Sequence, residues 1–239
     1  MNKDYNNSGN HILTIEYVSL PDDKGKYTGP LKGGKPEGVG TAVYENGVIY
    51  KGGFKNGLYD GFGIITTPKG FCYEGEFGEG VMAGHGKYKT SKGDVFVGEF
   101  KDNKENGPGV LTLRNGDVIE CDFLNGWENG HAVIKRANGD VFDGFYVNGR
   151  KQGRGIWKYA NGDVFECDYK DGVENGHGVF KYANGDVFEG EYIDGWKNGH
   201  GVVKYVNGDV LECEYKEGAA YGRGIKKYAN GDIVEYNYD

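Results

Sequence analysis

The chain has 239 residues, of which 45 are glycine and 14% are aromatic, and its formal net charge at pH 7 is −8. This charge argues against nucleic acid as a partner and disfavours anionic lipid, because both attract cationic surfaces. The first residues lack the apolar segment of a secretory signal, and no run approaches the roughly 18 apolar residues of a membrane-spanning helix. We therefore expect a cytoplasmic protein.

Residues 1–26 are expected to form a polar tail and a capping strand. The segment His11–Leu20 has the composition of a strand and is followed by Pro21–Gly25, a sequence typical of turns. We expect this strand to cover the open first edge of the sheet that follows.

From Tyr27 onward the sequence repeats with a period of 23 residues, without insertion or deletion, as far as Val234. Most glycines fall at five positions of this frame, which we number from 1 at Tyr27. The repeat array of residues 27–239 has repeats starting at 27, 50, 73, 96, 119, 142, 165, 188 and 211, with a final half repeat from 234. A fixed period of this length is a mark of repeat proteins, in which each unit packs mainly against its neighbours.

The segment Gly29–Pro36 comes close to the phosphate-binding sequence Gly-x4-Gly-Lys-Ser/Thr. However, Gly29 and Gly34 are ordinary glycines of the frame, and Pro36 lacks the hydroxyl that would bind magnesium. No helix can follow to direct its N-terminus at a phosphate. We expect no nucleotide and no other cofactor.

Each repeat contains two β-rich runs that end in glycine-containing turns. In the repeat that begins at Phe188, the side chains of Phe188, Gly190 and Tyr192 share one face of the first run, and two glutamates face the other way. Asn-Gly follows the second run in most repeats and favours a type I′ turn, with positive φ at both residues. The frequent glycines disfavour helix. The sequence therefore predicts an all-β fold, an elongated single-layer antiparallel β-meander of nine 23-residue hairpin repeats, solenoid-like, twisted and grooved.

The third frame position lies between aromatic rings and holds only Gly or Cys in the nine repeats. Cys121, Cys167 and Cys213 occupy it in alternate repeats. Two repeats separate neighbouring thiols, a spacing well beyond the roughly 7 Å between Cα atoms that a disulfide allows. We expect these cysteines to be packed as free thiols.

Periodic residues also argue against a metal site and against catalysis. Adjacent repeats should lie roughly 10 Å apart, too far for their histidines to share one zinc ion. The histidines that share one frame position are His85, His131, His177 and His200. Because cysteine and histidine recur with the period, and the only serines are Ser8, Ser19 and Ser91, we expect no catalytic residue and no enzyme activity.

The unit Tyr/Phe-x-Gly-x-Phe/Tyr, followed by Gly-x-x-x-Gly-x-Gly and Asn-Gly-Asp, closely resembles the MORN repeat, the membrane occupation and recognition nexus motif. The resemblance covers Tyr27 to about Tyr236. It implies a long twisted meander with a grooved face, and a scaffold that holds partner proteins near membranes or the cytoskeleton. We therefore expect a cytoplasmic location with cytoskeletal or membrane association.

We expect an extended or helical segment of a partner protein to bind along a groove lined by aromatic residues and glycine. The rings expected to line it are Tyr146, Tyr169, Phe188, Tyr192 and Tyr215. Trp127 and Trp196 share a frame position that varies between repeats. Two interpretations stay open for these tryptophans. They could be anchors for a partner, or their rings could pack over the polar segment that joins the two runs of their own repeat.

Two other functions are alternatives to the protein-binding scaffold. A phospholipid- or membrane-surface module is favoured by a row of lysines on the second runs and opposed by the acidic residues and the net charge. The chain could also serve as an accessory array for an enzyme on another chain, because the resemblance extends to arrays beside catalytic domains. Finally, the half repeat Ile233–Tyr238 predicts an exposed edge strand that could pair two copies into a homodimer.

Overall fold

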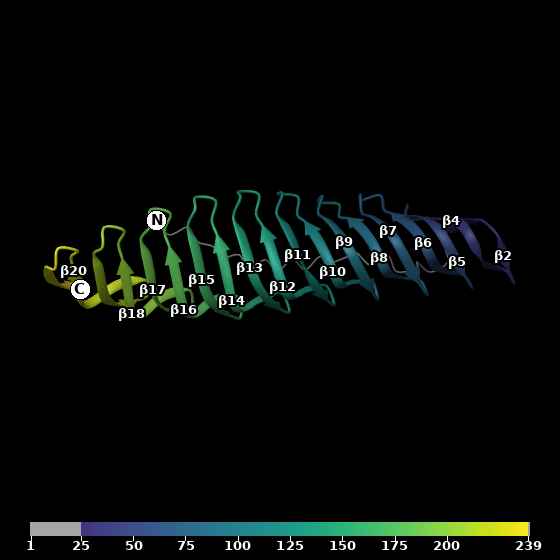
Figure 1. Cartoon of the computed structure of the whole chain (residues 1–239). Helices are drawn as coiled ribbons and strands as arrows, with labels where there is room; N and C mark the ends of the chain where they lie inside the picture. The colour runs from purple at the N-terminus through teal and green to yellow at the C-terminus, as the bar shows by residue number, and fades with distance from the viewer. Residues whose placement is uncertain (1–24, 239) are drawn as a thin grey trace. The chain divides into compact units, whose positions relative to one another are not determined.

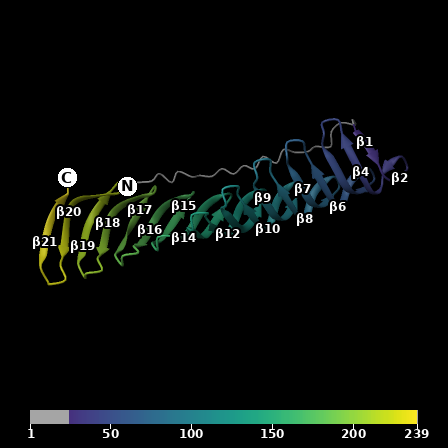
Figure 2. The same cartoon turned by 90° about the horizontal axis from the view of Figure 1, so that it is seen from above.

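The computed structural model describes residues 25–238, which form strands and turns without any helix in that range. Contacts divide these residues into two units, 25–129 and 130–238. Within each unit the strands succeed one another across an antiparallel sheet in sequence order, as the colour progression shows from two directions (Figures 1 and 2). The prediction of an all-β meander of hairpin repeats is confirmed. The predicted strand His11–Leu20 lies outside the described residues.

The unit of residues 25–129 begins with β1 (Gly25–Thr28), which pairs with β4 so that Tyr27 lies opposite Ala42. A short separate hairpin consists of β2 (Leu31–Lys32) and β3 (Lys35–Pro36). The meander then runs through β4 (Gly38–Tyr44), β5 (Ile49–Lys55), β6 (Leu58–Thr66), β7 (Cys72–Gly78), β8 (Val81–Lys89), β9 (Val95–Lys101), β10 (Lys104–Thr112) and β11 (Val118–Leu124).

The unit of residues 130–238 contains most of β12 and every later strand. Its strands are β12 (Trp127–Lys135), β13 (Val141–Val147), β14 (Arg150–Lys158), β15 (Val164–Lys170), β16 (Val173–Lys181), β17 (Val187–Ile193), β18 (Trp196–Lys204), β19 (Val210–Lys216), β20 (Ala219–Lys227) and β21 (Ile233–Tyr238). Each pairs antiparallel with the next, from β12 with β13 to β20 with β21.

The two turns of a repeat differ, and the type I′ turn is not where the Asn-Gly sequence predicts it. At frame positions 7 and 8, Asn56 and Gly57 have φ values of 52° and 87°, the positive pair that a type I′ turn requires. In the other turn Gly47 has a φ of 82°, whereas Asn46 is not among the positive-φ residues. The Asn46 Oδ1 instead accepts a hydrogen bond of 3.0 Å from the Val48 N–H. The prediction for Asn-Gly was therefore wrong, because the asparagine side chain stabilises a longer turn with a single positive-φ glycine.

The aspartate of Asn-Gly-Asp connects successive hairpins. Asn138 holds Asp140 through two hydrogen bonds, one from its Nδ2 to Oδ2 at 2.8 Å and one to its Oδ1 from the Asp140 N–H at 3.0 Å. The other carboxylate oxygen of Asp140 accepts a 2.9 Å hydrogen bond from the N–H of Ala160 in the next repeat. The same link recurs from Asp163 to Ala183 and from Asp186 to Val206. The turns on this side are therefore tied together by side-chain hydrogen bonds.

The interior is built from rings that lie over glycines. Gly52 and Gly63 are opposite each other on β5 and β6, and the fully buried Tyr50 covers both. A Cβ atom on Gly63 would lie 2.4 Å from the Tyr50 hydroxyl oxygen and 2.6 Å from its ring. The Tyr50 ring also meets Phe54 edge-on, with centroids 5.1 Å apart. The small residue expected at the third frame position is thus required by ring packing, and all four cysteines of the chain are free thiols.

Candidate functional site

The five rings expected to bind a partner lie on one face of the second unit, because all occupy frame positions 1 and 5 of alternate strands. Phe188 on β17 contacts Tyr192 and Tyr215, with ring centroids 6.1 and 5.3 Å away. Tyr169 on β15 and Tyr146 on β13 both meet the ring of Phe142 edge-on. We call this surface the aromatic face.

Most of these rings are more deeply buried than the sequence suggests. The exposed fractions are 9% for Tyr146, 3% for Tyr169, 1% for Phe188 and 7% for Tyr192, whereas Tyr215 is half-buried. The rings therefore contribute first to the interior of the sheet, and their outer edges form what a partner could contact.

A row of side chains that the sequence analysis did not single out lies opposite these rings. Frame position 10, on the second strand of each repeat, faces the ring at position 5: Lys151 pairs with Tyr146, Glu174 with Tyr169 and Lys197 with Tyr192. We call it the position-10 row; its members are Pro36, Tyr59, Met82, Glu105, Glu128, Lys151, Glu174, Lys197 and Ala220. The residue type at this position varies between repeats, whereas most of the frame is constant. That variation is the signal by which the sequence could have identified the position-10 row.

In the first unit two polar members of the row, Tyr59 and Glu105, make hydrogen bonds within the chain. Tyr59 stacks on Tyr50 with ring centroids 3.7 Å apart, and its hydroxyl donates a 2.6 Å hydrogen bond to the Tyr44 hydroxyl. Glu105 is 3% exposed and accepts a 2.5 Å hydrogen bond from the Tyr88 hydroxyl. Burial raises the pKa of Glu105, and the hydrogen bond from Tyr88 opposes that shift.

In the second unit the row carries two lysines among rings. The Lys151 Nζ lies 4.8 Å from the ring centroids of Phe142 and Trp157 and 5.1 Å from that of Tyr169. Burial lowers the pKa of Lys151 to about 8, while the charge of Glu174 acts in the opposite direction. Lys151 therefore has a compensating carboxylate on its own face.

Lys197 lacks such compensation. Its Nζ lies 3.7 Å from the ring centroid of Phe188 and 5.6 Å from that of Tyr215, and burial lowers its pKa. Within residues 25–238 no carboxylate forms an ion pair with it. The hydroxyl of Tyr169 on the same face is also buried; the Glu174 carboxylate lies near it, but no group in this part of the chain meets it with hydrogen-bond geometry.

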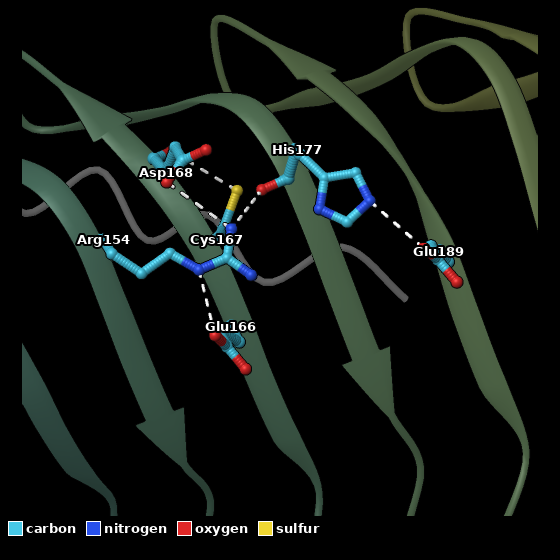
Figure 3. Close-up of polar contacts among 6 residues, drawn as sticks. All are labelled: Arg154, Glu166, Cys167, Asp168, His177 and Glu189. Atoms are coloured by element: carbon cyan, nitrogen blue, oxygen red, sulfur yellow. Dashed lines mark hydrogen bonds and ion pairs between the residues drawn. The ribbon is translucent and has the colours of Figure 1, made fainter.

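The opposite face carries the acidic residues expected from the alternation, paired with bases (Figure 3). The Arg154 Nε on β14 donates a 3.0 Å hydrogen bond to Glu166, and its Nη1 lies 3.5 Å from an oxygen of Asp168. Nη1 also donates to the His177 carbonyl at 2.9 Å, and the His177 ring nitrogen lies 3.4 Å from Glu189. These charges are partly exposed, so each pair is worth no more than about 1 kcal/mol. We call this surface the charged face.

Three of the four histidines of the shared frame position, His85, His131 and His177, contact carboxylates on this charged face. The His131 Nε2 lies 2.7 Å from an oxygen of Asp143, and the His85 Nε2 lies 3.9 Å from one of Glu99. Among residues 25–238, no three metal-ligating side chains are grouped so as to hold a metal ion.

Each of the two tryptophans is the first residue of a strand, Trp127 of β12 and Trp196 of β18. Neither belongs to a connecting segment, because the turn before each strand has only two residues. The Trp196 side chain is 48% exposed, and one side of its ring lies over Gly218 in the turn of the following repeat. Trp127 is half-buried. Trp196 thus packs on a neighbouring turn and still presents a ring to solvent.

The last strand of the described chain, β21, pairs with β20. Ile233, Val234 and Tyr236 on it are 64%, 40% and 36% exposed. Within the described residues, no helix has the length and apolar composition to cross a bilayer.

Comparison with known proteins identifies the repeat. The family described as "MORN repeat" matches at residues 27–49, 50–71, 73–95, 96–118, 122–141, 142–164, 168–187 and 188–210. A search of the curated proteins found no match.

Solved structures with the same fold include the TCP10 domain of Danio rerio CPAP in complex with a peptide of Danio rerio STIL. That domain is 13% identical and has a TM-score of 0.50, and the alignment covers 89% of this chain and 100% of the domain. The domain without the peptide is 14% identical with a TM-score of 0.46, covering 82% and 93% of the two chains. The SAS-4 TCP domain of Drosophila melanogaster, in complex with a proline-rich motif of Ana2, is 15% identical with a TM-score of 0.41, covering 65% and 85%. At 13% identity the likeness to the first of these domains concerns the fold alone.

Proposed function

The chain belongs to the MORN repeat family, and we propose that it is a non-catalytic scaffold that binds a segment of a partner protein on the aromatic face of residues 130–238. One observation carries the proposal. All strands of residues 130–238 belong to one sheet, so nothing in this part of the chain forms a second layer over the rings. The face of a single-layer sheet that no second layer covers is a typical surface for a protein partner.

The proposed mechanism combines two kinds of contact. The half-buried ring of Tyr215 supplies apolar area of the kind that dominates binding energy at interfaces, and the exposed ring of Trp196 at the start of β18 is a candidate second anchor. Lys151 and Lys197 supply charges that set the register of the bound segment. The TCP10 domain of CPAP, which shares the fold and is seen with a STIL peptide, offers a precedent for a single sheet that binds a peptide.

Photo-crosslinking from the two faces tests this proposal. A photo-reactive amino acid is placed in the full chain at Tyr215 on the aromatic face, or at Lys204, which lies on the charged face 3.6 Å from Glu189. After irradiation in extract of the source cell, we expect one recurrent partner segment to be linked from Tyr215 and not from Lys204. Crosslinks that arise from Lys204 alone would contradict the proposal.

The membrane-surface function is less well supported, because lysines of the second strands already pair with acidic residues. The Lys227 Nζ lies 2.9 Å from Glu212, in addition to the contact of Lys204 with Glu189. Flotation with vesicles that contain phosphoinositide tests this alternative, and binding that persists at high salt would favour it.

Two further elements of the proposal concern assembly. We place the scaffold at cytoskeletal or membrane-associated assemblies, as the family leads us to expect, and proximity labelling in the source cell would identify them. The exposed strand β21 is proposed to pair two copies into a homodimer, with main-chain hydrogen bonds across the edge. A monomeric mass by light scattering at high protein concentration would exclude that pairing.

A further inference from the structure

Two polar groups on the aromatic face, the half-buried Lys197 ammonium and the buried Tyr169 hydroxyl, have no hydrogen-bond acceptor in suitable geometry within residues 25–238. The Lys197 ammonium lies against Phe188, at 3.7 Å from its ring centroid, and no carboxylate of residues 25–238 pairs with it. The Tyr169 hydroxyl, in a residue that is 3% exposed, has no hydrogen-bond partner there. Removing such groups from water without a new partner is costly, so their burial calls for an explanation.

Other members of the position-10 row show that the repeat frame does not force a polar group to lose water without gaining a partner. Lys151 occupies the same frame position as Lys197, and Glu174 lies on the next repeat as its counter-charge. In the first unit Glu105 receives the hydroxyl of Tyr88. Lys197 thus differs from Lys151, because no carboxylate of residues 25–238 stabilises its charge and only the Cys213 side chain opposes the effect of burial on its pKa.

We infer that the segment bound on the aromatic face carries an aspartate or glutamate opposite Lys197, with apolar residues on either side of it. This inference rests on the proposed function of the face and specifies the chemistry of the partner. The carboxylate would accept a charge-assisted hydrogen bond from the Lys197 Nζ, while a flanking apolar side chain lies against the half-buried ring of Tyr215.

A carboxylate fits this site better than a phosphate group does. A single ammonium is a point charge that balances one carboxylate, whereas phosphate is commonly held by several donors or by the fork of an arginine. The Arg136 guanidinium lies over Trp157, at 4.5 Å from the ring centroid, and not beside Lys197. The Glu174 carboxylate beside Tyr169 would repel a doubly charged group. An acidic peptide is therefore the preferred occupant.

A displayed library of random twelve-residue peptides, selected on the full chain, tests the inference. We expect the selected peptides to share an acidic residue flanked by apolar ones. In fluorescence polarisation their affinity should fall about tenfold or more for Lys197→Met, as expected for loss of a hydrogen bond between charged groups. Lys197→Arg should keep most of the affinity.

Lys204→Met is the matched control, because Lys204 lies on the same strand but on the charged face, paired with Glu189. Its affinity for the peptides should stay within about twofold of wild type. Since Lys197→Met removes a buried charge and keeps the side-chain volume, it should melt at or above the wild-type temperature, which separates lost binding from lost folding.

Each remaining outcome overturns the inference in a distinguishable way. Peptides without acidic preference that bind wild type and Lys197→Met equally would overturn the acidic partner and leave the binding face in place. Peptides whose affinity depends on Lys204 and not on Lys197 would overturn the proposed function as well.

A dimer by light scattering that Lys197→Met dissociates would make a second copy the occupant. Competition by a synthetic peptide of residues 1–24 that requires Lys197 would make the chain's own N-terminal segment the occupant.

Discussion

The two units share one frame but differ in what lies opposite their aromatic rings. In residues 25–129 the position-10 row presents Pro36, Tyr59, Met82, Glu105 and Glu128, of which Tyr59 and Glu105 make hydrogen bonds to tyrosines. In residues 130–238 it presents Lys151, Glu174 and Lys197, and the last of these lacks a carboxylate partner. The frame fixes glycines and rings but leaves position 10 open, so this position can give each repeat its own chemistry. We interpret the first unit as mainly structural and the second as the recognition surface.

The largest expected effect should be the same in both units, because it concerns the shared frame. A Cβ atom on Gly86 in the first unit would lie 2.4 Å from the Tyr73 hydroxyl oxygen, and one on Gly201 in the second would lie 2.8 Å from the Tyr215 ring. We expect Gly86→Ala and Gly201→Ala each to lower the free energy of unfolding by about 3 kcal/mol in urea titrations, since rings over a glycine have little room to move. A loss below about 1 kcal/mol at either site would show that the rings adapt, and the common frame would no longer explain the packing.

A pair of tyrosine variants should separate the units. Tyr88→Phe in the first unit leaves the buried Glu105 without its donor, and we expect a loss of about 2 kcal/mol. Tyr169→Phe in the second unit removes a hydroxyl that has no partner in the described chain, so its stability should change by less than about 0.5 kcal/mol. The free energy of unfolding is measured for both variants by thermal and urea unfolding. Equal losses would show that the two units do not differ in whether these hydroxyls have a hydrogen-bond partner.

The pH dependence of stability should report the buried lysine of the second unit. Burial lowers the pKa of Lys151 from 10.5 to about 8, so above pH 8 the folded chain binds fewer protons there than the unfolded chain does. The free energy of unfolding should therefore rise with pH through this group, by about 1 kcal/mol between pH 8 and 9.5. Lys151→Met should lack this gain. The difference between wild type and variant is the quantity to measure, because the thiols and tyrosines titrate in both proteins.

The smallest effects are expected on the charged face, which should contribute little to either unit. Arg154→Met breaks the contacts with Glu166 and Asp168, and the partial exposure of all three side chains limits the expected loss to about 0.5 kcal/mol. Peptide affinity should not change. A loss above about 2 kcal/mol would mean that this network, and not the ring packing alone, holds the repeats together.

The sequence predicts the architecture well because the frame is set by short-range rules. Ring and glycine alternate with the period of a strand, so Phe188, Gly190 and Tyr192 could be assigned to one face in advance. Turn geometry was harder: Asn-Gly favours a tight turn, but the Asn46 side chain accepts the Val48 N–H and stabilises a longer one. Local propensity cannot reveal how many residues a turn will use.

The proposed recognition surface was only partly predictable for a related reason. The rings of Tyr146 and Tyr215 were identified as part of one face, but their depth depends on packing between strands, which a single sequence does not express. Lys197 was not singled out, because only the register of β17 with β18 places it opposite Tyr192. Its charge also lies in a row where other repeats carry Tyr59 or Met82, so no periodic pattern marks it.

A structure of the full chain with a selected acidic peptide would test the central claim most directly. The claim predicts the peptide on the aromatic face, against Tyr215, with a carboxylate oxygen about 3 Å from the Lys197 Nζ. A peptide bound on the charged face, beside Arg154 and Glu166, would contradict it.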